Sequence, residues 1–253
     1  MAALGDVIAA LDELLAPHEF ADYGPNGLQV PGRDEVRTVA TGVSAHAELF
    51  ELALAERADL VLTHHGILWD AAPRRIDAAM ARRLRLLLEN EIGLAAYHLP
   101  LDAHPDMGNN ALIADGLGCA SREPFAEHHG RTLGCVGRFD GDGIGIDELV
   151  DRVRSLTDRE PLVFAEGPAR VVSLGIVSGA GAGHLDEAID LKLDAFLTGE
   201  PAERVMAQAK EAGLHFIAAG HYATETFGVR ALGEHLAKRF GVRHVFLDVP
   251  NPV

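Results

Sequence analysis

The chain has 253 residues, enough for one large domain or two modest ones, each with its own core. Its 48% hydrophobic and 24% charged residues exclude collagen-like, low-complexity and largely disordered chains. The 22 basic and 38 acidic side chains leave a net charge of 22 − 38 = −16, which disfavours nucleic-acid and membrane partners. One segment is dense in positive charge, and we interpret it as a solvated helix face: Arg74, Arg75, Arg82, Arg83 and Arg85.

The predicted elements begin with a helix whose apolar residues recur on one face from Val7 to Leu15. A turn at 24–27 leads into a short strand at 28–30. Apolar and amphipathic runs then alternate, which indicates crossover connections and an α/β fold. The expected strands are 39–43, 59–62 and 93–97, and the expected helices are 47–57 and 74–90.

The second half repeats this order at the level of individual residues. The matches are Ala58–Thr63 with Leu193–Thr198 (offset 135), Gly42 with Gly175 (133), Gly93 with Gly213 (120), and His98-x3-Asp102 with His221-x3-Glu225 (123). We therefore predict two similar αβα lobes related by internal duplication, with a site in the cleft between them. A (β/α)8 barrel also fits the length but does not explain the repeat.

The join between the lobes is expected in a polar stretch at 121–131, followed by a turn at 141–143. This places one lobe at 1–125, with part of the C-terminal segment packing nearby, and the other at 126–253. We expect one compact unit without an inserted domain.

Export and membrane insertion are not expected from the sequence. Asp6, Asp12 and Glu13 interrupt the apolar positions near the N-terminus, and no run approaches the roughly 18 apolar residues of a membrane span. Cys119 and Cys135 are too few and too distant for a disulfide framework. A cytoplasmic protein is the simplest expectation.

Polar residues that favour metal chemistry follow three predicted strands. His64 and His65 end the apolar run 59–62, and ligands collect at the carboxyl ends of strands in α/β sheets. His98 and Asp102 follow the run 94–97, and Pro100 between them favours an extended loop over a helical turn. A second pair, His128 and His129, follows polar residues and is expected on a surface loop.

The third strand end, after 216–219, carries His221 and Glu225. Thr224 is expected to cap the next helix and to place Glu225 in its first turn. Together the strand ends supply three imidazoles and two carboxylates, which suit two Zn, Fe, Mn or Co ions that activate water and polarise a substrate oxygen. The alternative is a structural network of histidines and carboxylates without metal.

At this point the sequence resembles a family, the GTP cyclohydrolase I type 2 homologues, also called NIF-three-like dinuclear-metal hexamer proteins. The motifs that carry the resemblance cover essentially the whole chain: Asn26–Val30, Thr63–Gly66, Tyr97–Pro105, Gly108–Asn110, Thr198–Glu200 and Gly220–Glu225. The resemblance implies two divalent metal ions per subunit, two αβα lobes and a toroidal homohexamer whose metal sites face an interior cavity. The implied ligands are His64, His65, Asp102, His221 and Glu225, with Glu225 shared by both ions.

The resemblance also implies a reaction, the opening of the guanine imidazole ring of GTP to give dihydroneopterin triphosphate and formate. Such a hydrolysis needs activated water, a Lewis acid and a proton donor to the leaving nitrogen. His98 is the expected donor, or it orients Asp102, and Glu225 is the other catalytic candidate. The expected function is thus a metal-dependent hydrolase of a nucleotide or nitrogen heterocycle. The alternative is a ring-shaped metal-binding scaffold or regulator that holds a protein or nucleic-acid partner.

Weaker substrate-binding candidates lie elsewhere in these motifs. The glycine-rich segment 178–183, with Gly181 at its centre, either cradles phosphate or makes a tight turn between strand and helix. Glu200 occupies the position equivalent to His65 in the second repeat, and Asn26 and Gln29 either contact substrate or secure a turn. Trp69 is expected in a cavity wall or in packing.

Overall fold

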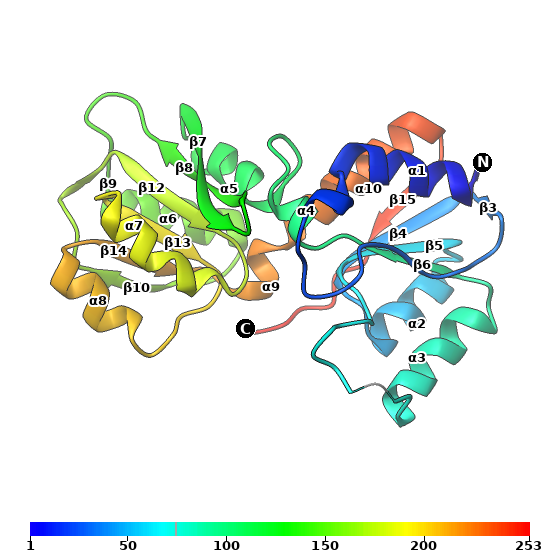
Figure 1. Cartoon of the computed structure of the whole chain (residues 1–253). Coiled ribbons are helices and arrows are strands. Elements are labelled where there is room, and N and C mark those ends of the chain that lie inside the picture. Colours follow the sequence, from blue (N-terminus) through cyan, green and yellow to red (C-terminus); the bar gives the residue numbers. More distant parts are fainter. Residues whose placement is uncertain (74) are drawn as a thin grey trace. The chain divides into compact units, whose positions relative to one another are not determined.

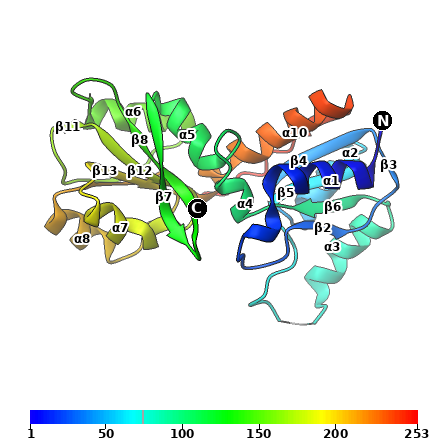
Figure 2. The same ribbon diagram turned by 45° about the horizontal axis from the view of Figure 1, so that its top comes forward.

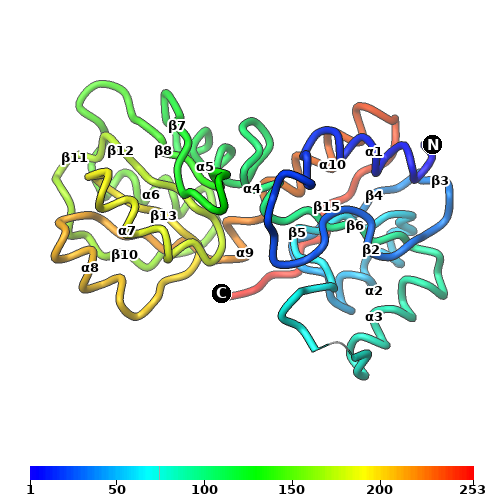
Figure 3. Tube along the Cα trace, viewed as in Figure 1, coloured from blue at the N-terminus to red at the C-terminus, as the bar shows by residue number. Residues whose placement is uncertain are grey.

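The computed structural model describes residues 1–73 and 75–253, and these residues fold into two compact units. The first unit comprises Met1–Leu101 and Gly228–Pro250, and the second comprises Asp102–Phe227 and Asn251–Val253. The chain therefore leaves the first unit at Asp102 and returns to it at Gly228, a path that can be followed by colour in Figure 3.

The boundary differs from the predicted division at residue 125. Helix α5 (Asn109–Leu117) buries Ile113 and Leu117 in a core shared with the second unit's sheet. Strand β7 (Ser121–His128) pairs with β8 (Arg131–Arg138) over the segment expected to be a polar join. Both elements therefore belong to the second unit. The expectation that part of the C-terminal segment packs with the first lobe agrees with β15 (Arg243–Phe246), which pairs in parallel with β4 (Thr38–Ser44).

The first unit is built on a sheet with the strand order β15-β4-β5-β6-β2. Strands β4, β5 (Leu60–His65) and β6 (Gly93–Ala96) are parallel, and β2 (Gly27–Val30) runs antiparallel to β6. A short pair, β1 (Ala2–Ala3) with β3 (Glu35–Val36), lies outside this sheet. The helices are α1 (Leu4–Leu15), the 3-10 turn Pro17–Glu19, α2 (Ala47–Ala55), α3 (Ala78–Leu88) and α10 (Thr226–Phe240).

The helices of this unit cover both faces of the sheet. Figure 1 shows α1 and α10 on one face and α2 and α3 on the other. On the second of these faces, Phe50 and Leu87 pack with Val61 and Leu94 of the strands. Helix α3 begins at Ala78 because Asp77 accepts a hydrogen bond from the Met80 amide, so it is shorter than the predicted 74–90. Arg74 lies outside the described residues.

The second unit is built on a sheet with the strand order β10-β14-β13-β12-β8-β7. Strands β12 (Ser173–Val177), β13 (Ala195–Thr198) and β14 (His215–Ala218) are parallel, while β10 (Leu162–Ala165) and β8 flank them antiparallel. A short pair, β9 (Ile144–Gly145) with β11 (Arg170–Val171), forms a separate two-stranded sheet. The helices are α5, α6 (Ile146–Thr157), the 3-10 turn Gly181–His184, α7 (Leu185–Asp190), α8 (Val205–Ala212) and α9 (His221–Thr224).

Two apolar clusters mark the two faces of this sheet. Leu149 and Val153 of α6 pack with Ile176 and Leu197, whereas residues of α7 and α8 pack with Phe196 on the opposite face. Figure 2 shows α5 and α6 above the sheet and α7 and α8 below it. Each unit is thus an αβα sandwich, and the mixed α/β class is as predicted. Among the described residues, no helix has the length and apolar character needed to cross a membrane.

The central strands of the two units share one register. Leu60 pairs with Val39 in the first unit, and Ala195 pairs with Leu174 in the second, with offsets of 195 − 60 = 135 and 174 − 39 = 135. The third strands differ by 215 − 93 = 122, because Gly93 occupies the position of His215. The offset of 135 predicted for the middle strands agrees with this register. The predicted offsets of 133 and 120 do not, because matching glycines do not occupy matching ladder positions.

An aspartate at the start of the middle strand serves the same role in each unit. Asp59 accepts hydrogen bonds from the amides of Arg37 and Thr38 at 2.8 and 3.0 Å. Asp194 accepts them from Val172 and Ser173 at 2.9 and 2.8 Å. These carboxylates satisfy backbone donors where the first parallel strand begins.

Replacing Asp59 with alanine is therefore expected to lower the free energy of unfolding by about 1–3 kcal/mol, because two backbone donors lose their acceptor. Urea unfolding followed by circular dichroism measures the change, with exposed Asp70→Ala as the matched control. Equal stabilities of the two variants would contradict this role of Asp59.

Candidate metal centre

Both histidines at the end of β5 lie within the strand, not after it as expected. His64 is fully buried and His65 is half-buried, and their ring centroids are 4.8 Å apart. Neighbouring strand residues ordinarily point to opposite faces, so the approach of these rings depends on where the strand stops at Gly66. A side chain at Gly66 would collide with Gln29, with a Cβ 2.3 Å from its Nε2.

The Nδ1 atom of each imidazole is held by a neighbouring oxygen. His64 Nδ1 lies 3.1 Å from the Tyr97 carbonyl, so it donates and leaves the lone pair on Nε2. His65 Nδ1 lies 3.0 Å from the Ser44 hydroxyl. Metal-ligating histidines are commonly oriented by such a partner on the second ring nitrogen. The first unit's histidines therefore fit a metal-binding role.

His98 is held by Asp22, an aspartate that no sequence motif indicated. Its Nδ1 lies 2.7 Å from Asp22 Oδ1, and its backbone amide donates to Asn26 Oδ1 at 2.7 Å. Burial raises the pKa of Asp22, but its bonds to His98 and Asn26 outweigh that effect, so the pKa lies below its usual value. Asp22 follows no predicted strand and belongs to none of the motifs, which explains why no sequence signal indicated it.

His98 joins His64 and His65 in one cluster. One nitrogen of each ring lies within 4.8 Å of the others, a spacing compatible with a shared ion. Trp69 packs beside the cluster, 5.3 Å from the His98 ring centroid and 5.8 Å from that of His65, and its Nε1 donates to the Gly66 carbonyl. Trp69 thus forms an apolar wall next to the imidazoles.

The two amide side chains predicted near substrate stabilise local backbone. Gln29 accepts from the Ile67 amide at 2.9 Å and donates to the Pro25 carbonyl at 2.7 Å. Asn26 donates to Asp22 and accepts from the His98 amide. Asn26 and Gln29 were expected either to contact substrate or to secure a turn, and these contacts are of the second kind.

Asp102 is the first residue of the second unit and ends a short helical turn, α4 (Leu99–Asp102). The predicted extended loop is wrong here, because Pro100 lies in the first turn of a helix, where its missing N–H has no consequence. Asp102 is buried, and its Oδ1 accepts from Asn109 Nδ2 at 2.8 Å and from Ser178 Oγ at 3.0 Å. Two donors on one oxygen fix the orientation of the carboxylate.

His221 lies between two carboxylates. Its Nε2 is 3.1 Å from Glu225 Oε1, and its Nδ1 bonds to Glu200 Oε1. Burial lowers the pKa of His221, but the two carboxylates outweigh burial and raise it to about 9. Glu200 therefore orients His221 by its contact with Nδ1. The buried carboxylate of Glu225 lies on the opposite side of the ring, beside Nε2.

Thr224 has a different role from the predicted helix cap. It ends α9, donates through Oγ1 to the Gly220 carbonyl at 2.8 Å and accepts from the Gly179 amide at 3.0 Å. Glu225 lies between α9 and α10, not in the first turn of α10. The backbone amide of Gly179 therefore secures the turn that carries His221 and Glu225.

The remaining sequence candidates lie apart from these contacts. Gly181 begins a 3-10 turn and packs closely, since a Cβ there would lie 2.6 Å from Val177 and 2.8 Å from Thr198. His128 ends β7, and positive φ angles at His129 and Gly130 make the hairpin turn, so His129 lies in the expected loop whereas His128 lies in a strand. In the arginine-rich segment, Arg82 pairs with Glu51 at 2.6 Å.

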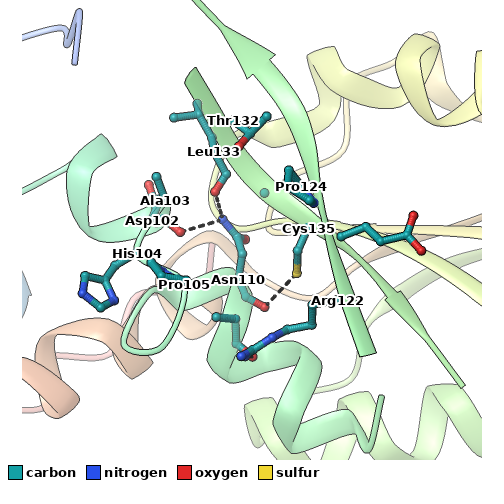
Figure 4. A pocket seen from close by; sticks show the side chains of 13 residues that line it. Asp102, Ala103, His104, Pro105, Asn110, Arg122, Pro124, Thr132, Leu133 and Cys135 are labelled. Carbon is teal, nitrogen blue, oxygen red and sulfur yellow. Dashed lines mark hydrogen bonds between the residues drawn. The ribbon is translucent and has the colours of Figure 1, made fainter. Parts of the chain in front are cut away.

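A cavity of about 350 Å³ opens beside Asp102 in the second unit. Figure 4 shows Asn110 between Asp102 and Cys135, whose thiol donates to the Asn110 carbonyl. Asn110 spans one wall by donating to the carbonyls of Asp102 and Leu133. The volume is in the range of small-molecule pockets. None of the predicted substrate residues lines it.

The fold and these residues define a class: an α/β protein of two αβα sandwiches, with histidine and carboxylate clusters at the carboxyl ends of its parallel strands. The family model Duf34/NIF3 (NGG1p interacting factor 3) matches residues 2–252, and the chain belongs to this family.

Several relatives match over nearly the whole chain. A Pseudomonas aeruginosa protein named "GTP cyclohydrolase 1 type 2 homolog" is 41% identical, covering 99% of this chain and 98% of its own. Among solved structures, TTHA1606 from Thermus thermophilus matches with a TM-score of 0.91 and 40% identity. Protein ybgI, described as of unknown function, matches with a TM-score of 0.93 and 37% identity. Both structural matches cover 100% of each chain.

Cys135, which lines the cavity, and Cys119 provide a test of burial in the second unit. Burial raises the pKa of Cys135 to about 12, and burial with nearby Asp115 raises that of Cys119 to about 11. Because the thiolate is the nucleophile, alkylation by iodoacetamide at pH 8 is expected to be at least about 100-fold slower than at a free, exposed cysteine.

Mass spectrometry after timed labelling measures both sites. Ser155→Cys, on the exposed face of α6, supplies the exposed reference. If Cys135 were labelled as fast in the folded protein as in protein unfolded by guanidinium, its burial would be contradicted.

Proposed function

We propose that this protein is a dinuclear metal-dependent hydrolase that acts on a nucleotide or another nitrogen heterocycle. The observation that carries the proposal is the orientation of the ligands: the Nδ1 atoms of His64, His65 and His221 each have an oxygen partner, which supports Nε2 as the atom that would bind metal. Asp102 and Glu225 add buried carboxylates. Three imidazoles and two carboxylates suit Zn, Fe, Mn or Co.

When bound, two such ions supply Lewis acidity that activates water and polarises a substrate oxygen. In this proposal Glu225 would be the ligand shared by the two ions, as the family resemblance implies. His98 would be the proton donor, because the Asp22 carboxylate holds its Nδ1 and thereby orients the ring, which leaves Nε2 for contact with the substrate. This carboxylate–histidine pair gives the imidazole a defined tautomer and orientation.

The names of the relatives support a purine substrate for the proposal. Hydrolysis of the imidazole ring of a purine breaks both bonds of C8 to nitrogen, consumes two water molecules and releases C8 as formate. Each nitrogen leaves as an amine after it gains protons, so a positioned donor such as His98 is required. The cavity beside Asp102 supplies space for a small molecule next to a proposed ligand.

Two further parts of the proposal concern the history and assembly of the chain. The shared strand offset of 135 and the matching roles of Asp59 and Asp194 support an internal duplication of the αβα unit. We also propose a homohexamer, on the strength of the family resemblance, and a cytoplasmic location, on the strength of the two distant cysteines and the charges that interrupt the apolar N-terminal positions. Light scattering coupled to size-exclusion chromatography measures the subunit number.

Metal content provides the first test. Protein reconstituted with Mn²⁺ or Co²⁺ is expected to hold two ions per chain, and Asp102→Ala and Glu225→Ala are expected to lose at least one. Inductively coupled plasma mass spectrometry gives the stoichiometry, and anomalous scattering from soaked crystals gives the positions. Exposed Glu211→Ala is the control. The absence of anomalous peaks beside His64 and His221 would contradict the dinuclear centre.

Turnover provides the second test. Reconstituted protein incubated with GTP labelled with ¹³C at C8 is expected to release ¹³C-formate, followed by nuclear magnetic resonance. Asp102→Ala and Glu225→Ala are expected to reduce the rate by at least about 100-fold, while Glu211→Ala keeps it. A fully metallated protein that turns over neither GTP nor a panel of nucleotides would instead favour the ring-shaped scaffold or regulator. Activity retained in Asp102→Ala would make the catalytic assignment wrong.

A further inference from the structure

Two residues that follow β12, Ser178 and Gly179, lie between the two carboxylates proposed as ligands in the second unit. Ser178 is buried, and its Oγ donates to Asp102 Oδ1 at 3.0 Å. On the next residue, an added Cβ at Gly179 would come within 2.2 Å of Glu225 Oε1. One dipeptide therefore touches both carboxylates.

The dipeptide is itself held on several sides. The Ser178 amide donates to Asn110 Oδ1 at 2.7 Å, and the Gly179 amide donates to Thr224 Oγ1 at 3.0 Å. The Gly179 carbonyl accepts from the amides of Gly199 and Glu200, both at 2.9 Å. These bonds tie it to α5, to the end of β13 and to the turn that carries His221 and Glu225.

The identity of each residue matches this position. Gly179 has φ of +62°, a backbone conformation that side chains disfavour, and Glu225 occupies the space that a side chain would need. Ser178 supplies one of the two donors on Asp102 Oδ1, and fully buried Asn109 supplies the other at 2.8 Å. The hydroxyl at 178 therefore bonds to Asp102, and the lack of a side chain at 179 leaves the space that Glu225 occupies.

We propose that Ser178 and Gly179 are positioning residues that set the orientation and spacing of Asp102 and Glu225 for metal binding. This inference rests on the proposed function, because it assigns those carboxylates to metal. It gives the glycine-rich segment a role in ligand placement, distinct from both a phosphate cradle and a simple tight turn. The side chain at 178 acts on Asp102, and the bare backbone at 179 acts on Glu225.

The test measures Co²⁺ binding by the full-length protein. Ser178→Ala and Gly179→Ala are each expected to weaken Co²⁺ affinity by about 10–100-fold, the usual effect of losing a partner that orients a metal ligand. Each is also expected to change the visible d–d absorption spectrum, which reports ligand geometry. Ser178→Thr keeps the hydroxyl and is expected to restore both affinity and spectrum.

Matched controls lie in the same unit. Ser155→Ala removes a hydroxyl that bonds only locally in α6, and Gly183→Ala adds a methyl where no atom lies within 4 Å. Thermal unfolding of each metal-free variant monitors the fold. The two variants act through different carboxylates, so Gly179→Ala tests the proposal even where Ser178→Ala does not fold.

The outcomes separate this inference from the proposed function. Wild-type protein that binds no Co²⁺ would overturn both. Wild-type binding with unchanged affinity and spectrum in both Ser178→Ala and Gly179→Ala would overturn the positioning role and leave the metal centre standing. Weakened binding in Gly183→Ala equal to that in Gly179→Ala would also overturn it, because the effect would then be a general one of the segment.

Discussion

Parallel pairing of three strands in each unit governs where the polar chemistry lies. Hydrogen bonding of β4, β5 and β6 brings Ser44, His65 and the carbonyl of Tyr97 to one edge of the first sheet. Hydrogen bonding of β12, β13 and β14 does the same for Ser178 and His221 in the second. Loss of either ladder would scatter the donors and acceptors that orient the imidazoles and carboxylates.

The candidate site depends as much on these neighbours as on the ligands. His64 is oriented by a backbone carbonyl, His65 by a hydroxyl, and His221 by a carboxylate. A backbone partner survives any side-chain change at Tyr97, whereas the other two partners can be removed by substitution. The first unit's buried histidine is therefore the most strongly protected part of the site.

The α/β class, the strand ends and the histidines follow from apolar periodicity and from the order of the motifs. The residues that the sequence did not reveal contact partners that lie far away along the chain. Asp22 reaches His98 from 76 positions away, and Ser178 reaches Asp102 across the same separation. No local pattern encodes such pairs. Pro100 and Thr224 misled for another reason, since each residue type fits two local geometries and tertiary contacts decide between them.

The return of the chain to its first unit has a consequence for biosynthesis. Strand β15 occupies an edge of the first sheet, yet it is translated after every strand of the second unit. During translation, β4 therefore keeps an unpaired edge until residues 243–246 leave the ribosome, while residues 102–227 already contain all strands of the other sheet. The first unit, which contains the N-terminus, is consequently the second of the two units to acquire all of its strands.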